Sequence, residues 1–159
     1  MPGAKVIRTF RNPWDVAVSL YKQRYVANIP YSASFFNIGV FMSNYEAVNI
    51  FWNKRLKNNI RILDIRYEDL VQNKDYYQKK IYDFLDLKGE YNEEKRKSFF
   101  SQTASIRQIG QSVHIKSIEK NEFLENKNEF YDALLMQRKY WENRGFEFKN
   151  NDFFGYKLD

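Results

Sequence analysis

The sequence contains no cysteine and a single histidine, His114, among its 159 residues. The absence of cysteine excludes disulfides, thiolate metal sites and cysteine nucleophiles. No group of histidine, aspartate and glutamate residues has the spacing of metal ligands, so we expect no metal site. His114 has no carboxylate at a useful spacing, and we assign it a structural or exposed position rather than the role of a general base.

Long apolar runs are also missing. The longest, such as FFNIGVFM at 35–42, fall short of the roughly 18 residues that a membrane-spanning helix needs. The first residues lack the apolar segment of a signal peptide, so we expect a soluble, cytoplasmic protein. No glycine-rich loop ends in Lys-Ser or Lys-Thr, which disfavours a P-loop kinase.

The composition that is present indicates a folded chain with an anionic partner. Hydrophobic residues make up 43% of the sequence and aromatic residues 18%, which is too rich for disorder. The length suits one domain, and we expect a single domain over 1–159. The 26 Lys and Arg residues against 20 Asp and Glu give a net charge of +6. This charge is compatible with a phosphorylated ligand, nucleic acid or a membrane surface, and equally with a merely soluble surface.

The first strand-to-helix junction lies near the N-terminus. Residues 4–10 form a short apolar run with β-branched side chains, typical of a strand. Asn12 is a good N-cap, Pro13 suits the first helical position, and Asp15 completes a pattern like a capping box. We predict a helix from this point to about Val26.

A second junction and a long helix follow. Residues 60–66 form another apolar strand that ends at Tyr67, and the acidic residues Glu68 and Asp69 suit a helix start. The segment between the two junctions predicts a helix over 35–56. Its stripe at three- and four-residue spacing is assigned to the core, and comprises Phe41, Tyr45, Val48 and Trp52.

Further helices are predicted over 75–85, 92–100 and 122–143, with a tail that shows no periodicity. The last helix should bury Phe130, Leu134, Met136 and Trp141 and should end at Gly145 as its C-cap. Two strands joined by a helix form a βαβ unit with a parallel sheet. Two strands are too few for a doubly wound sheet, so further strands are supplied from elsewhere or the chain is part of a larger fold.

Arg11 is the first candidate binding residue. An arginine at the carboxyl end of a strand, beside the free N–H groups of a helix start, forms a cationic, donor-rich corner suited to a phosphate. Ser19 lies two turns into the same helix, on the side of Asp15. The alternative is an exposed arginine and an ordinary helical serine.

Three segments in order resemble the sulfotransferase superfamily, and most closely its tyrosyl-protein and bacterial branch. AKVIRTFRNPWDVAVSLY resembles the segment that binds the 3′-phosphate, with Arg11 and Ser19 at the matching positions. RILDIRYEDLV resembles the next strand, with Tyr67 near the nucleotide. TASIRQIGQSVHIKSIEK resembles the later loop, and the positions that match there are Ser105, Gln108, Ser117 and Lys120.

The resemblance implies an α/β fold with a P-loop-like parallel sheet and flanking helices. It also implies binding of 3′-phosphoadenosine 5′-phosphosulfate (PAPS) and transfer of its sulfuryl group to a hydroxyl or amine acceptor. Arg11 and Ser19 would hold the 3′-phosphate and Tyr67 would flank the adenosine, while Ser105, Gln108 and Lys120 would close over the nucleotide. The acceptor, whether protein, lipid, saccharide or small molecule, and the formation of homo-oligomers are left open.

The sequence also departs from this family. It contains no loop resembling the one that cradles the 5′-phosphosulfate, and its first residues already match the middle of the family pattern. We therefore expect an N-terminally incomplete fold that is inactive alone, and we assign no catalytic residue. The alternatives are a non-catalytic anion-binding remnant or scaffold, and a basic nucleic-acid-binding domain, which we disfavour.

Overall fold

The computed structural model describes residues 3–23, 29–56, 60–89, 123–149 and 151–158. The elements along these segments are β1 (Lys5–Phe10), α1 (Pro13–Gln23), η1 (Pro30–Ala33), α2 (Phe35–Leu56), β2 (Arg61–Arg66), α3 (Tyr67–Gln72), α4 (Lys74–Leu85), η3 (Leu124–Asn126), α7 (Lys127–Glu142), β3 (Asp152–Phe153) and β4 (Tyr156–Lys157). The helix predicted over 92–100 falls outside the described residues. No helix in the described part of the chain is long and apolar enough to cross a membrane.

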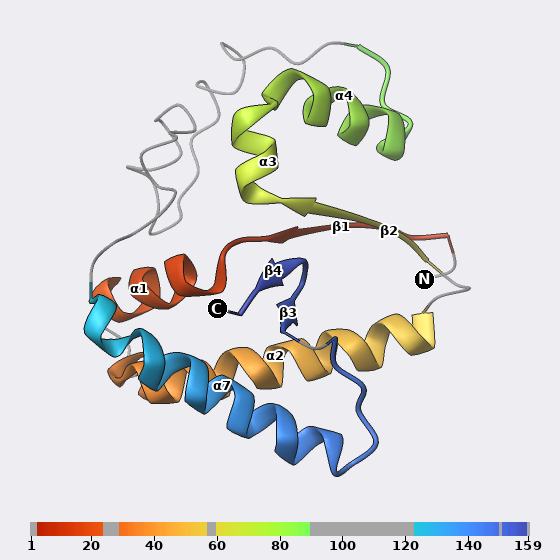
Figure 1. The fold of residues 1–159 in the computed structure, drawn as a ribbon. Coiled ribbons are helices and arrows are strands. Elements are labelled where there is room, and N and C mark those ends of the chain that lie inside the picture. The colour runs from red at the N-terminus through yellow and green to blue at the C-terminus, as the bar shows by residue number, and fades with distance from the viewer. Residues whose placement is uncertain (1–2, 24–28, 57–59, 90–122, 150, 159) are drawn as a thin grey trace.

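The expected βαβ unit is confirmed. Strands β1 and β2 pair in parallel, from Lys5 opposite Arg61 to Phe10 opposite Arg66, with the long helix α2 between them in the chain (Figure 1). Many helices with one small parallel sheet make an arrangement compatible with the α/β class. In the described segments this sheet has two strands.

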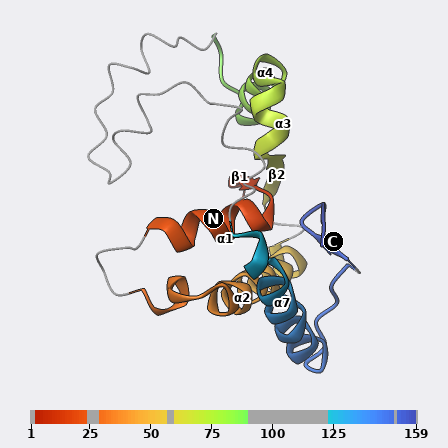
Figure 2. The ribbon, with the colours of Figure 1, turned by 60° about the vertical axis from the view of Figure 1, so that its left-hand side comes forward.

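The sheet lies between two helical layers (Figures 1 and 2). Toward α2, the Arg8 guanidinium donates to Asn53 Oδ1 at 2.6 Å. Toward α4, Lys5 forms an ion pair with Asp86, which caps the C-terminus of that helix. Because side chains alternate across a strand, Lys5 and Arg8 reach opposite faces.

The buried core lies in the helical layer of α1, α2 and α7. A close approach of α2 and α7 makes this possible, because a Cβ atom on Gly39 would lie 2.4 Å from the carbonyl oxygen of Phe130. Helices α3 and α4 contain no fully buried residue. The core cluster comprises Trp14, Ala17, Val18, Phe35, Ile38, Met42, Phe130, Leu134, Phe153 and Leu158.

The predicted core stripe of α2 is wrong. Its four residues, Phe41, Tyr45, Val48 and Trp52, are between 37% and 53% exposed. The helix buries its other side, where Gly39 lets the α7 backbone approach and Ser43 is buried. Hydrophobic spacing located the helix but did not identify the side that α7 covers.

The prediction for α7 holds in part. Phe130 and Leu134 are fully buried, whereas Met136 is 49% exposed. Trp141 is half-buried and donates from Nε1 to Asn44 Oδ1 at 2.7 Å. The expected C-cap, Gly145, lies two residues beyond the observed cap, Asn143.

The C-terminal tail contains regular structure, although its lack of periodicity had suggested an irregular segment. Strands β3 and β4 pair antiparallel, and the two residues between them, Phe154 and Gly155, both have positive φ, at 51° and 88°. This is the backbone of a tight hairpin turn. The hairpin buries Phe153 and Tyr156 against the rest of the molecule.

Candidate functional site at the strand ends

The structure brings two of the predicted site residues together. Arg11 follows β1, and Tyr67 follows β2 as the first residue of α3 rather than the last residue of the strand. Because parallel strands end at the same edge of a sheet, the Arg11 guanidinium carbon lies 4.9 Å from the centre of the Tyr67 ring. A cation that lies above an aromatic ring is attracted by the negative face of the ring. A flat cationic group and an aromatic surface are thus placed side by side.

Asp15 orients the Arg11 guanidinium. Its carboxylate Oδ2 lies 3.6 Å from Arg11 Nη2, and the Asp15 side chain is almost entirely buried. The pair spans one turn at the start of α1. A buried carboxylate beside an arginine helps to fix the position of the guanidinium.

The N-terminus of α1 does not offer the free amides that we expected. Asn12 Oδ1 accepts hydrogen bonds from the N–H groups of Trp14 and Asp15, at 2.9 and 3.3 Å. Pro13 has no N–H. The donors that a helix start would give to an anion are therefore already used by the Asn12 cap, and an anion at this corner depends on side chains.

Glu68 is the residue at this site that sequence reasoning missed. Its Oε1 accepts the N–H of Asn12 at 3.0 Å, the amide that a capping box would have given to Asp15. Its Oε2 accepts a hydrogen bond from the Tyr156 hydroxyl of the C-terminal hairpin. Glu68 therefore joins α3, the start of α1 and the hairpin. The helix-start pattern predicted only a favourable charge at this position, and no signal linked it to Tyr156.

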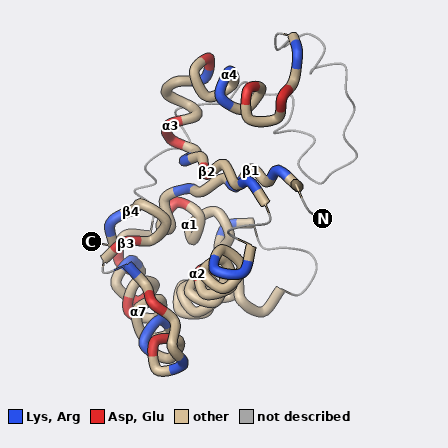
Figure 3. Tube along the Cα trace, turned by 90° about the vertical axis from the view of Figure 1, so that its right-hand side faces the viewer, with Lys and Arg blue, Asp and Glu red and all other residues tan. Residues whose placement is uncertain are grey.

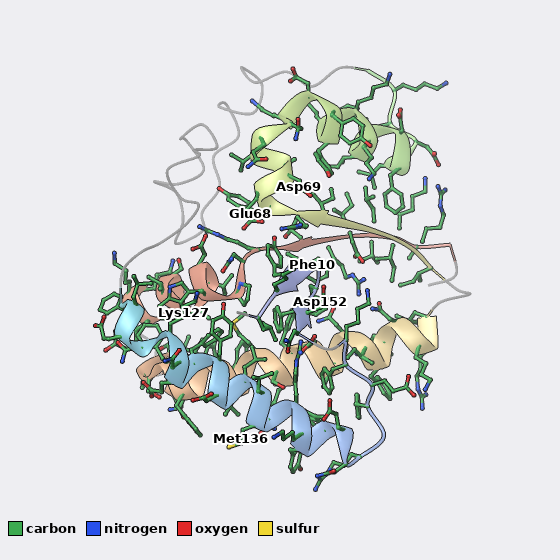
Figure 4. All side chains as sticks on the ribbon, in the orientation of Figure 1. Phe10, Glu68, Asp69, Lys127, Met136 and Asp152 are labelled. Carbon is green, nitrogen blue, oxygen red and sulfur yellow. The ribbon has the colours of Figure 1, made fainter. Side chains whose placement is uncertain are left out.

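The hairpin of β3 and β4 packs against the carboxyl ends of the parallel strands. Tyr156 lies 5% exposed, and burial, with a smaller effect of Glu68, raises the pKa of its hydroxyl. The Arg66 guanidinium carbon lies 4.4 Å from the Tyr156 ring centre. The hydrogen bond between the two residues raises the pKa of Arg66. Figure 4 shows Glu68 and Asp69 at the start of α3, with Phe10 and Asp152 between the sheet and α2.

The remaining predicted positions are further from this centre or outside the described residues. Ser19 is partly buried on α1, one turn beyond Asp15 on the same side of the helix. Ser105, Gln108, Ser117 and Lys120 fall outside the described residues, as does His114. Within the part of the chain that the structure describes, no group of three histidine, aspartate or glutamate side chains could hold a metal.

Charged residues lie on both strands and on α3, α4 and α7, whereas most of α2 carries none (Figure 3). Figure 3 shows basic residues on both strands and acidic residues at the start of α3. The strand ends therefore combine an oriented arginine, an aromatic ring and a polar network in a small region.

A family model described as the sulfotransferase family matches residues 1–93. The matched region includes β1, β2 and both residues of the Arg11–Tyr67 pair. The chain belongs to the sulfotransferase family.

An uncharacterized protein of Aquifex aeolicus (strain VF5) is 32% identical over 127 residues, which cover 75% of this chain and 16% of that protein. The chain thus spans a small part of the length of this relative. No solved structure matches the chain. The assignment to the sulfotransferase family therefore rests on the family model.

Proposed function

We propose that this sulfotransferase chain carries the part of a PAPS site that holds the 3′-phosphate and the adenosine. The observation that supports the proposal is the contact between Arg11 and Tyr67 at the ends of two parallel strands. A 3′-phosphate is a dianion, for which a guanidinium held in place by Asp15 provides paired donors. Tyr67 gives the adenosine an aromatic surface.

In this proposal the phosphate site extends from Arg11 along α1. Ser19 lies on the same side of the helix as Asp15 and adds a hydroxyl donor to the phosphate when the ligand lies along the helix. Ser105, Gln108 and Lys120 are proposed to cover the nucleotide from the loop that the sequence places there. Since the first-turn amides of α1 bind Asn12, we expect Arg11 to contribute more of the affinity than a helix terminus usually does.

The reaction that follows from this site is transfer of a sulfuryl group. The acceptor hydroxyl or amine forms a bond to sulfur, the bond from sulfur to the bridging phosphate oxygen breaks, and the acceptor loses its proton. Adenosine 3′,5′-bisphosphate leaves as the product. Catalysis of such a transfer depends mainly on positioning and on stabilising charge. The donors around the reacting sulfur are not among the residues that we assign, so we expect nucleotide binding rather than turnover from these residues alone.

Calorimetric titration with adenosine 3′,5′-bisphosphate tests the proposal. We expect binding that is weaker by at least about tenfold for adenosine 5′-monophosphate, because a charge-assisted hydrogen bond to the phosphate contributes about 1.5–3 kcal/mol. Arg11→Ala should weaken binding by a similar factor. The matched control is Arg144→Ala, since Arg144 also lies over a tyrosine ring, with its guanidinium carbon 3.6 Å from the centre of Tyr140.

Three outcomes would contradict the proposal. Equal affinity for both nucleotides would show that the 3′-phosphate is not recognised. Equal losses in the Arg11 and Arg144 variants, together with an affinity that falls steeply with salt, would indicate binding by net charge alone, as a nucleic-acid-binding surface would show. Absence of binding by the folded chain would favour a scaffold role.

A further inference from the structure

We propose that Glu68 and the hairpin residue Tyr156 are positioning residues that hold the Arg11 side chain over the Tyr67 ring. The observation that leads to this proposal is that both peptide groups flanking Arg11 are hydrogen-bonded to this pair of side chains. The inference rests on the proposed nucleotide site for its effect on binding. It adds to that site a segment outside residues 1–93, the region that the family model matches.

The backbone on either side of Arg11 is held by two hydrogen bonds. The N–H of Asn12, which belongs to the peptide group after Arg11, donates to Glu68 Oε1 at 3.0 Å. The carbonyl oxygen of Phe10, which belongs to the peptide group before Arg11, accepts a hydrogen bond of 3.2 Å from the Tyr156 hydroxyl. Because each peptide group is planar, holding both of them fixes the φ and ψ angles of Arg11. The direction in which its side chain leaves the backbone is then set.

Glu68 and Tyr156 also hold one another. The Tyr156 hydroxyl donates to Glu68 Oε2, so each carboxylate oxygen of Glu68 has its own partner. Burial, with a smaller effect of Glu68, raises the pKa of the Tyr156 hydroxyl, which therefore remains a donor at neutral pH. Glu68 directly follows Tyr67 in the chain. The same carboxylate thus ties the residue that carries the aromatic ring to the backbone that carries Arg11.

The hairpin that carries Tyr156 is anchored in the buried helical layer. In Figure 1 it lies between the parallel strands and α2. Arg138 of α7 donates to the carbonyl oxygen of Asp152 at 2.6 Å and is also bound to Glu46 of α2. Phe153 belongs to the buried core cluster. The position of the Tyr156 hydroxyl therefore depends on the packing of α2 and α7.

Aromatic contacts place the hairpin against the last residue of each parallel strand. The rings of Phe10 and Phe154 stack with their centres 4.3 Å apart, and the Arg66 guanidinium carbon lies 4.4 Å from the centre of the Tyr156 ring. These contacts use the rings and not the hydroxyl. The hydroxyl of Tyr156 is therefore the group whose removal separates positioning of Arg11 from packing of the hairpin.

Tyr156→Phe tests the proposal, because it keeps the ring and removes the hydroxyl. We expect this variant to weaken the binding of adenosine 3′,5′-bisphosphate by about tenfold in a calorimetric titration. Binding of adenosine 5′-monophosphate should change little, since that nucleotide has no 3′-phosphate for Arg11 to bind. A general loss of structure would weaken both nucleotides alike, so the loss of selectivity identifies a positioning role.

Tyr77→Phe is the matched control. The Tyr77 hydroxyl also donates to a carboxylate of α3, at 3.4 Å from Asp69 Oδ2, rather than to a peptide group beside Arg11. Removing it takes away a hydrogen bond between a tyrosine and a carboxylate in the same region of the molecule. We expect the affinity for the bisphosphate to be unchanged in this variant.

Two substitutions of Glu68 provide a conservative rescue. In Glu68→Gln the amide oxygen still accepts the N–H of Asn12, and the amide NH₂ donates to the Tyr156 hydroxyl, which still donates to Phe10. Glu68→Ala removes all of these bonds. We therefore expect Glu68→Ala to weaken binding as much as Tyr156→Phe, and Glu68→Gln to retain more of the affinity. This pair also serves as the test if Tyr156→Phe does not fold.

An NMR measurement without nucleotide separates this inference from the proposed function. The Arg11 guanidinium carbon lies 4.9 Å from the centre of the Tyr67 ring, so the ring shifts the signals of nearby Arg11 side-chain protons. Tyr67→Leu defines their positions without the ring. In Tyr156→Phe we expect these signals to move toward those positions, whereas Tyr77→Phe should leave them as in the wild type.

These measurements decide the two proposals separately. Arg11 signals that stay in place in Tyr156→Phe and Glu68→Ala would overturn the positioning role, whatever the nucleotide affinity. Loss of bisphosphate binding in Arg11→Ala but not in Tyr156→Phe would also overturn it. If the wild-type chain binds no bisphosphate and the Arg11 signals still move in Tyr156→Phe, the nucleotide assignment fails and the positioning of Arg11 stands.

Discussion

The two helical layers on either side of the sheet differ in how they are held. The layer of α1, α2 and α7 is joined by a buried aromatic and aliphatic cluster. The layer of α3 and α4 has no fully buried residue. Helix α4 meets the sheet through an exposed ion pair and an arginine over Phe84, and α3 is held by the hydrogen bonds of Glu68 to Asn12 and Tyr156. The strand-end site lies between the two, so one side of the candidate nucleotide site is anchored and the other is lightly attached.

The largest difference between the layers should be the loss of unfolding free energy caused by a substitution in the core. Phe130 is fully buried between α7 and α2, 5.8 Å from the ring centre of Trp14. Phe130→Ala should lower the free energy of unfolding by about 3–5 kcal/mol, measured by urea denaturation. The control is Tyr76→Ala on α4, where the side chain is 62% exposed, and we expect a change within about 0.5 kcal/mol. Similar losses in both variants would show that the layers contribute equally.

A buried ion pair should make the stability of the same layer depend on pH. Arg138 donates to both carboxylate oxygens of Glu46, at 2.7 and 2.8 Å, and both side chains are almost fully buried. Burial raises the pKa of Glu46 to about 7, against the opposing effect of the arginine. Between the ordinary value of 4.5 and about 7, the folded state binds more protons than the unfolded state, so stability falls as pH rises.

Arg138→Met removes the partner of this carboxylate. We expect a loss of about 3–5 kcal/mol at pH 8, because removing Arg138 raises the pKa of Glu46 further and folding must then keep this buried carboxyl protonated, and a smaller loss at pH 5, where it is neutral. Urea midpoints at both pH values measure the effect, and Glu46→Gln should flatten the dependence on pH. Arg144→Met, an exposed arginine just beyond α7, is the control. An equal loss at pH 5 and pH 8 would contradict the assignment of charge to Glu46.

Gly39→Ala should change the free energy of unfolding by a smaller amount, and the sign of that change is informative. Helix propensity alone predicts that this change stabilises α2 by about 1 kcal/mol. The new Cβ atom would meet the carbonyl oxygen of Phe130 at 2.4 Å, which forces the helices apart, so we expect a loss of about 1–3 kcal/mol instead. Thermal and urea denaturation measure the sign directly. A stabilised variant would show that the two helices do not depend on this close approach.

These comparisons also show what the sequence could predict. The parallel strand pair and the 35–56 helix follow from local patterns, since strand ends and helix caps depend on adjacent residues. Tyr67 was expected near Arg11 from the family resemblance. The buried side of α2 could not be predicted, because it depends on where Gly39 admits α7, some ninety positions along the chain. Glu68 and Tyr156 meet for the same kind of reason. One feature of the sequence could have indicated the hairpin, namely the aromatic residues around Phe154 and Gly155.

The smallest effect should come from the ion pair between Lys5 and Asp86. The Asp86 side chain is 72% exposed, and the hydrogen bond from Lys5 lowers its pKa. A lowered pKa stabilises the fold above the unfolded value and loses this contribution as pH falls through the folded value. Asp86→Asn keeps a residue that tolerates the left-handed cap, where φ is 57°.

We therefore expect Asp86→Asn to leave the urea midpoint unchanged within error at neutral pH and moderate salt, as is usual for exposed pairs. Asp83→Asn, an exposed residue on the same helix, is the control, and repeating both in high salt tests the contribution of charge. A loss as large as that of Gly39→Ala would show that the α4 layer is anchored by this one contact. The weak attachment inferred from its lack of buried residues would then be wrong, and the nucleotide site would have two firm sides.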